Sequence, residues 1–127
     1  TVDHKMHAEW YEISDQAARI ITQAKRNNRR IIAVGTTALR ALESSAAFNG
    51  CVTAEARDTD IFITPGFEFA AIDGLLTNFH LPKSTLFMLV SALVGLENMQ
   101  AAYTHAIEND YRFYSYGDTS LLWKSGQ

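Results

Sequence analysis

The first periodic segment of the chain runs from about Asp15 to Asn28 and has the apolar spacing of an amphipathic helix. Its recurring apolar positions are Ala17, Ile20, Ile21 and Ala24. Ser14 precedes it, and serine is a preferred residue at the N-cap of a helix. We therefore predict a helix with one buried face.

A continuous apolar run, Ile31 to Val34, follows and ends at Gly35. Such a β-branched run is typical of a parallel strand covered on both faces. Thr36 or Thr37 can then cap a second helix. The inward positions of that helix are Leu39, Leu42 and Ala46.

The pattern of the middle of the chain predicts a surface loop followed by three short strands. The loop is expected over Phe48 to Arg57. The predicted strands are Asp60 to Thr64, Phe67 to Ile72 and Leu75 to Phe79.

Two helices and a strand are predicted in the last third. The first helix is capped by Ser84 and is apolar on nearly every side from Leu86 to Val94, which indicates burial. The second is capped by Asn98 and ends near Asp110, with inward positions Met99, Ala102, Tyr103, Ala106 and Ile107. The aromatic tail, Phe113 to Trp123, is expected to pair as a last strand.

Strands alternating with helices define an α/β fold with a mostly parallel sheet. The 127 residues are 47% hydrophobic and 20% charged, a composition that excludes disorder and supplies one core. We expect residues 1–127 to be a single domain, or the C-terminal portion of the α/β domain of a longer enzyme. A net charge of −3 argues against binding nucleic acid by bulk electrostatics. The single cysteine, Cys51, cannot form an internal disulfide, and this favours a cytoplasmic protein.

Two strand-to-helix turns carry the groups best suited to chemistry. At Gly35 to Thr37, free backbone N–H groups and a helix dipole can hold an anion, and Arg40 can add a guanidinium fork. The alternative is that Arg40 pairs with Glu43. The second turn spans Thr77 to Thr85, and we expect both turns in one crevice because both strands end at the same sheet edge.

The second turn holds His80, Lys83 and Ser84. Lys83 and Ser84 can hold a phosphate, and His80 can transfer a proton near neutral pH. The structural alternatives remain open: a core histidine, a solvated lysine and a helix cap.

Four cations at the end of the first helix form the one local patch that can meet a phosphate backbone: Lys25, Arg26, Arg29 and Arg30. They also suit a solvated helix end. A metal site built on His4, His7 and Glu9 lacks further ligands, so we expect no metal.

Several motifs together resemble one family. They are Met6-His7-Ala8-Glu9, Val34-Gly35-Thr36-Thr37 with Arg40, Thr59 to Ile63 with Pro65-Gly66, Thr77 to Leu86, and Ser115-Tyr116-Gly117-Asp118. Over about Met6 to Leu122 the chain is similar to the S-adenosylmethionine:tRNA ribosyltransferase-isomerases of queuosine biosynthesis. Members are longer, with an α/β domain and a smaller β-barrel domain, so the chain resembles their C-terminal portion.

The resemblance implies transfer and isomerisation of the ribosyl part of S-adenosylmethionine onto 7-aminomethyl-7-deazaguanine in a tRNA anticodon. The products are epoxyqueuosine, adenine and methionine, with S-adenosylmethionine as a substrate and neither cofactor nor metal implied. The chain alone is expected to be inactive.

Site residues follow from the same resemblance. The expected catalytic residues are His80 and His7. The expected substrate-binding residues are Glu9, Gly35, Thr36, Thr37, Arg40, Asn78, Lys83, Ser84, Tyr116 and Asp118. The expected RNA contacts are the four cations at the end of the first helix, and this expectation rests on their charge alone. Ala8 stands where the family pattern has Ser, and Thr119-Ser120 where it has Ala-Met.

Two other functions remain open. Another nucleotide- or S-adenosylmethionine-binding α/β enzyme, such as a methyltransferase, also uses a strand-to-helix turn, but it should carry a glycine-rich loop that this sequence lacks. The other is a non-catalytic fragment that only contacts RNA.

Overall fold

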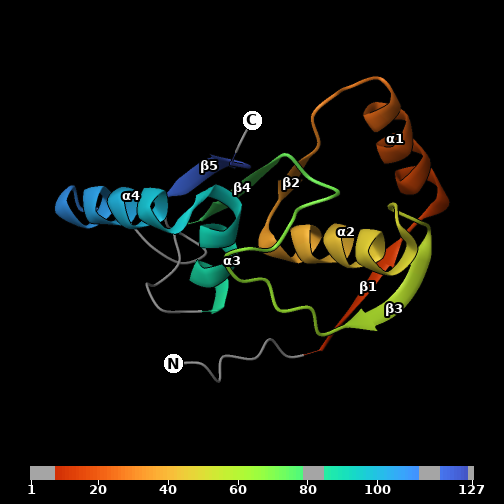
Figure 1. The fold of residues 1–127 in the computed structure, drawn as a ribbon, viewed down its shortest axis with the longest axis horizontal. Helices are drawn as coiled ribbons and strands as arrows, with labels where there is room; N and C mark the ends of the chain where they lie inside the picture. The colour runs from red at the N-terminus through yellow and green to blue at the C-terminus, as the bar shows by residue number, and fades with distance from the viewer. Residues whose placement is uncertain (1–7, 79–84, 112–117, 126–127) are drawn as a thin grey trace.

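The computed structural model describes residues 8–78, 85–111 and 118–125. Figure 1 shows their arrangement, in which helices alternate with short strands as predicted. The elements in chain order are β1 (Glu9–Ile13), α1 (Asp15–Arg26), β2 (Ile32–Val34), α2 (Thr36–Asn49), β3 (Glu55–Thr59), β4 (Gly74–Asn78), α3 (Thr85–Val94), α4 (Leu96–Glu108) and β5 (Thr119–Trp123). Chain 1–127 thus has the α/β character expected of it.

The strands form two sheets, and the prediction of a mostly parallel sheet is wrong. β1 and β3 pair antiparallel, with Glu9 opposite Thr59. In the other sheet the strand order is β2-β4-β5, in which β2 is parallel to β4 and β5 is antiparallel to β4. β5 brings the chain back beside β4 after α4, and this return creates an antiparallel edge on the parallel pair.

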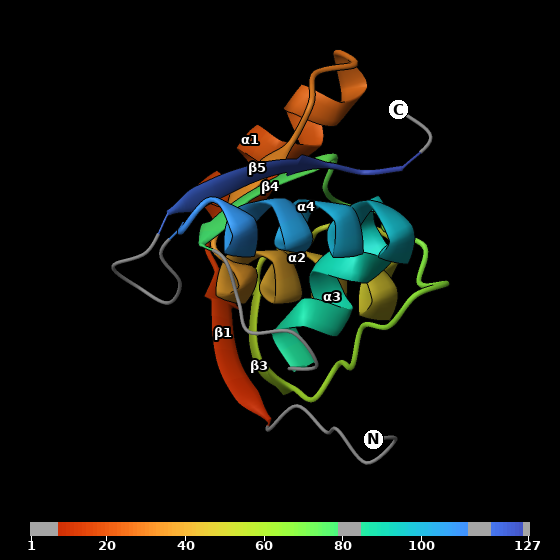
Figure 2. The ribbon, with the colours of Figure 1, turned by 90° about the vertical axis from the view of Figure 1, so that its left-hand side faces the viewer.

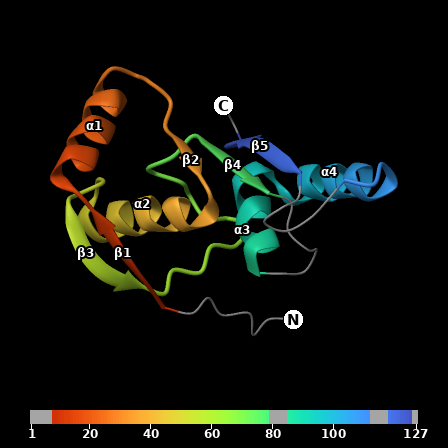
Figure 3. The same ribbon diagram turned by 180° about the vertical axis from the view of Figure 1, so that it is seen from behind.

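The main core lies on one side of the β2-β4-β5 sheet. Figure 2 shows α2, α3 and α4 on that side, and Figure 3 shows the same elements from behind. Ala33, Leu75 and the α3 residues Leu89, Val90 and Leu93 are almost completely buried. The predicted burial of the apolar helix α3 is therefore confirmed.

The strand β2 is covered on only one face by the described chain. Ala33 is buried, but its neighbours Ile32 and Val34 are 44% and 69% exposed. The prediction that this strand is covered on both faces is therefore wrong for the residues that the structure describes.

The first two helices begin differently. Ser14 caps α1 as predicted, because its Oγ accepts a hydrogen bond from the Ala17 N–H at 3.1 Å. The N-cap of α2 is Gly35, with φ +90° and no side-chain cap, so the prediction that Thr36 or Thr37 caps this helix is wrong. Glycine adopts this positive φ without strain, and it turns the chain directly from β2 into α2.

The predicted loop and strands of the middle region are displaced. α2 continues to Asn49, and the strand is Glu55–Thr59 instead of Asp60 to Thr64, because β1 pairs with this earlier segment. Residues 67–72 are also not a strand, although Phe69 and Ile72 are buried. Side-chain groups take up several of their backbone hydrogen bonds in place of a neighbouring strand.

The last helix begins earlier than predicted. α4 starts at Leu96 after Gly95, and Asn98 lies inside it, where its Nδ2 donates to the Val94 carbonyl at 2.8 Å. Ile107 was expected to face inward but is 58% exposed. Of the predicted C-terminal strand, Thr119–Trp123 is confirmed and residues 113–117 lie outside the described ones.

Among the described helices, no single one is long and apolar enough to cross a membrane. α3 and α4 meet the length and composition requirement only as a pair, and a bend of 118° separates them.

Candidate functional site

The carboxyl ends of β2 and β4 lie side by side. Val34 is opposite Leu76, and the Gly35 N–H donates to the Leu76 carbonyl at 2.8 Å. The Gly35 to Thr37 turn and Asn78 therefore occupy the same edge of the sheet, which is the part of the predicted crevice that the structure describes. β5 begins at this edge too, because Thr119 is opposite Asn78, so Asp118 lies beside it.

Several predicted site residues lie outside the described ones: His7, His80, Lys83, Ser84 and Tyr116. Their roles stay predictions. The proposed meeting of Arg40 and His80 in one crevice is likewise untested.

Arg40 is 3% exposed and contacts two other segments, β1 and the segment that follows β3. Its guanidinium forms an ion pair with Glu9 of β1, and Nη2 donates to the Ile61 carbonyl at 3.1 Å. Nε is buried and has no partner among the described residues. Burial lowers the pKa of Arg40, and the Asp60 carboxylate opposes that shift.

The alternative pairing of Arg40 with Glu43 does not form. The Glu43 carboxylate is 1% exposed and accepts backbone N–H donors from Ala70, Ala71 and Ile72 at 2.9–3.0 Å. It therefore fixes the loop that leads into β4, and hence the position of Asn78. The sequence pattern did not predict this role of Glu43. The available signal was a carboxylate on the inward stripe of α2, between Leu39 and Ala46.

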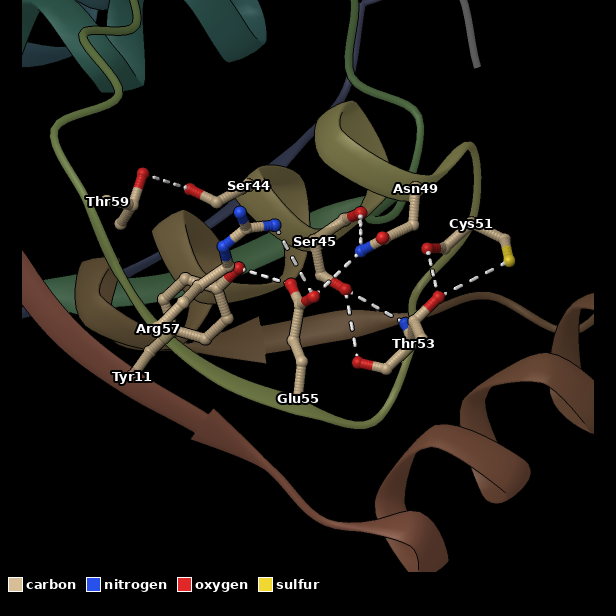
Figure 4. Close-up of polar contacts among 9 residues, drawn as sticks. All are labelled: Tyr11, Ser44, Ser45, Asn49, Cys51, Thr53, Glu55, Arg57 and Thr59. Atoms are coloured by element: carbon tan, nitrogen blue, oxygen red, sulfur yellow. Dashed lines mark hydrogen bonds and ion pairs between the residues drawn. The ribbon is translucent and has the colours of Figure 1, made fainter.

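A polar cluster joins α2 to β1 and β3 (Figure 4). The Tyr11 hydroxyl donates to Glu55 at 2.5 Å, and Asn49 Nδ2 donates to the other Glu55 oxygen at 3.0 Å. Burial, with help from Glu55, raises the pKa of Tyr11, and the hydrogen bond from Tyr11 is the largest cause lowering the pKa of Glu55. Ser44 and Thr59 share a buried hydrogen bond of 2.7 Å.

These contacts show how the α2 face opposite the main core is held. Ser45 accepts from the Thr53 N–H at 2.9 Å and donates to the Thr53 carbonyl at 3.2 Å. Together with the Glu9–Arg40 pair, they anchor the β1-β3 ribbon to the helix that begins at Gly35. The described polar groups of this region are thus largely committed to structure.

The four cations at the end of α1 and just after it are all exposed. Arg30 stacks on Trp123, with its guanidinium carbon 4.9 Å from the ring centre. Lys25 and Arg26 line a cavity of about 330 Å³ whose wall also includes Cys51. None of the four forms an ion pair with another described residue.

A metal site finds no support in the described part of the chain, where no group of three or more His, Cys, Asp or Glu side chains is placed to hold an ion. His7 lies outside the described residues, so the sequence candidate that includes it is not tested.

The fold and the site together define a class of protein. It is an α/β protein with polar groups at the carboxyl ends of its strands. The family model described as queuosine biosynthesis protein matches residues 1–122. The chain belongs to that family.

Relatives and a solved structure agree. The chain is 64% identical over 96% of its length to an S-adenosylmethionine:tRNA ribosyltransferase-isomerase of Sphingopyxis alaskensis, and it covers 35% of that protein. It is 60% identical over 98% of its length to the protein of the same name from Rhodopseudomonas palustris and covers 34% of it.

A crystal structure of S-adenosylmethionine tRNA ribosyltransferase from Thermotoga maritima is similar with a TM-score of 0.81 and 42% identity. The match covers 88% of this chain and 39% of that one. The chain therefore spans about a third of the length of the curated relatives it matches.

Proposed function

We propose that the chain is the C-terminal portion of an enzyme that modifies tRNA in queuosine synthesis. The enzyme transfers and isomerises the ribosyl part of S-adenosylmethionine onto 7-aminomethyl-7-deazaguanine in the anticodon, yielding epoxyqueuosine, adenine and methionine. The observation that carries this proposal is 64% identity to a relative of that name over 96% of the chain.

The reaction needs a base that removes a proton beside the sulfonium and an acid that assists adenine departure. His80 and His7 have side chains whose ordinary pKa suits both tasks. His80 follows Asn78 by two residues in the sequence, and Asn78 lies at the sheet edge that Gly35 also occupies. His7 is two residues before Glu9, which is fixed by Arg40.

The edge formed by Gly35 to Thr37, Asn78 and Asp118 is proposed to bind substrate, together with Lys83, Ser84 and Tyr116. Backbone N–H groups at the start of α2 suit the methionine carboxylate or a phosphate. Glu9 and Arg40 are bound to each other. We therefore propose that Glu9 and Arg40 contribute to substrate binding by positioning neighbouring groups and through the positive charge of the guanidinium.

Binding of tRNA is proposed to use Lys25, Arg26, Arg29 and Arg30. These side chains are exposed within a chain of net charge −3, so any attraction for a polyanion must be local. The enzyme would act in the cytoplasm on tRNA. It would use S-adenosylmethionine as a substrate and need no metal or further cofactor.

Complementation tests this proposal. The complete protein that carries this chain is expressed in a bacterial strain deleted for its own ribosyltransferase-isomerase, and the nucleosides of its tRNA are identified by mass spectrometry. Restored queuosine is the expected result. Continued accumulation of 7-aminomethyl-7-deazaguanine in the presence of folded protein would contradict the proposal, and a methylated nucleoside would favour a methyltransferase.

A further inference from the structure

The carboxylates of Glu9 and Asp60 belong to the same end of the β1-β3 ribbon, next to Arg40. The register sets Glu9 opposite Thr59, so Asp60 directly follows the strand partner of Glu9. Arg40 contacts this end of the ribbon from α2, because its guanidinium bonds to Glu9 and to the Ile61 carbonyl. We call Glu9, Arg40 and Asp60 the Arg40 cluster.

The Arg40 cluster carries more negative than positive charge. It holds two carboxylates and one guanidinium, and no other described cation forms an ion pair with Glu9 or Asp60. Only Oε1 of Glu9 bonds to Arg40, and the Glu9 side chain is 44% exposed. Asp60 is exposed as well. The remaining oxygens are acceptors that face solvent beside a fixed cation, and they can receive a cationic donor.

Arg40 adds a donor that has no acceptor among the described residues. Its Nε is buried and unpartnered in a residue that is only 3% exposed. In the planar guanidinium, Nε–H lies on the same edge as one N–H of Nη2, and Nη2 donates to the Ile61 carbonyl. The unpartnered N–H therefore faces the segment that begins at Asp60. Residues 60–64 have no regular secondary structure, so a ligand can displace them without breaking a helix or a strand.

We propose that the Arg40 cluster binds the α-amino-acid head of S-adenosylmethionine. The ligand carboxylate bonds to Nε and Nη2 of Arg40 and takes the place of the Ile61 carbonyl. The ligand ammonium bonds to the second oxygen of Glu9 and to Asp60. A zwitterion suits the cluster because its two charged groups are attached to one carbon, and here donors and acceptors are neighbours. The inference rests on the proposed function and deepens it, since it leaves the N–H groups at the start of α2 to a phosphate.

Binding measurements with the complete protein test the proposal. Titration calorimetry compares S-adenosylmethionine with 5′-dimethylsulfonio-5′-deoxyadenosine, a headless ligand that keeps the adenosine and the sulfonium but lacks the amino-acid head. A saturating tRNA with guanine at the target position is present, so that no turnover occurs. Glu9→Gln and Asp60→Asn should each weaken S-adenosylmethionine binding by about tenfold or more, because each removes a charge-assisted hydrogen bond, and should change the affinity for the headless ligand by less than about twofold.

Two carboxylates of the same ribbon provide matched controls. Glu12 and Asp58 are exposed on the face of the ribbon opposite to Glu9, so Glu12→Gln and Asp58→Asn should change the affinity for neither ligand. Asp60 makes no hydrogen bond or ion pair with another described residue, so Asp60→Asn tests the proposal even if Glu9→Gln does not fold.

The comparison of ligands separates the possible outcomes. An equal loss of affinity for both ligands, or a loss for neither, overturns the proposal and leaves the proposed function intact. A loss confined to tRNA that carries 7-aminomethyl-7-deazaguanine, relative to the guanine tRNA, assigns the carboxylates to the aminomethyl group and also overturns the proposal. A folded wild-type protein that binds neither S-adenosylmethionine nor the headless ligand contradicts the proposed function, and this inference with it.

Discussion

Arg40 of α2 forms an ion pair with Glu9 of β1, thirty-one residues away in the chain, and the guanidinium also holds the Ile61 carbonyl. One buried cation thereby connects the ribbon, the helix that begins at the candidate site and the segment after β3. The pair joins the strand that follows His7 to the turn at Gly35.

Replacing Arg40 should destabilise the protein more than replacing an exposed arginine. Arg40→Met keeps most of the stem but leaves Glu9 without its cation and Ile61 without its donor, so we expect a loss of about 2–3 kcal/mol. The matched control is Arg57→Met, whose side chain is 44% exposed and should lose less than about 1 kcal/mol. Urea unfolding of the complete protein measures both, and equal losses would refute the structural role of Arg40.

Glu43→Gln should weaken the loop that enters β4. The Glu43 carboxylate uses both oxygens to accept hydrogen bonds from three backbone N–H groups. The glutamine amide has only one acceptor oxygen, and its NH₂ group would face N–H donors. We expect a loss of about 2 kcal/mol or more and a lower affinity for substrate. Glu68→Gln, exposed on the same loop, is the control and should change neither property.

Tyr11→Phe should remove a pH-dependent contribution to stability. The hydrogen bond from Tyr11 lowers the pKa of Glu55, so its stabilisation is present above the ordinary glutamate pKa of about 4.3 and is lost as pH falls through the lowered value. The wild-type protein should therefore exceed the variant in stability at pH 7 and lose that advantage toward pH 3. A difference that is constant over this range would show that Glu55 is not involved.

His80→Gln in the complete enzyme should lower turnover by about a hundredfold or more, as loss of a general acid or base commonly does. His7→Gln tests the second candidate in the same way. His105→Gln, exposed on α4, is the control. Wild-type turnover in both variants, with normal melting temperatures, would make the two histidines structural.

Single substitutions of Lys25, Arg26 or Arg29 by Gln should weaken tRNA binding and reduce the slope of log affinity against log salt by up to about 1 each. Arg57→Gln is the control from β3. Unchanged slopes in all three variants would remove the α1 end from the RNA interface.

The elements that could be predicted from sequence are those with strong local signals. α1 has its serine cap and apolar stripe, β2 ends at a glycine, and α3 is apolar on most sides. β3 could not be predicted, because Glu55–Thr59 is mostly polar and becomes a strand through pairing with β1. The apolar segment at 60–64 is the better strand by propensity, but tertiary pairing decides.

The candidate site was predictable to a similar extent. The meeting of the β2 and β4 ends follows from a parallel pair, and the structure has it. Local spacing suggested Glu43 as the partner of Arg40. The observed partner, Glu9, could not be predicted in this way because it comes near Arg40 only when β1 is in place. The role of Glu43 depends in the same way on a distant loop.

Product analysis with the complete protein shows whether it transfers the ribosyl group of S-adenosylmethionine to tRNA. The purified protein is incubated with S-adenosylmethionine and a tRNA that carries 7-aminomethyl-7-deazaguanine, and adenine, methionine and the tRNA nucleosides are quantified together. We expect adenine, methionine and epoxyqueuosine in equal amounts. Formation of S-adenosylhomocysteine with a methylated nucleoside, or no adenine from folded protein that binds both substrates, would contradict it.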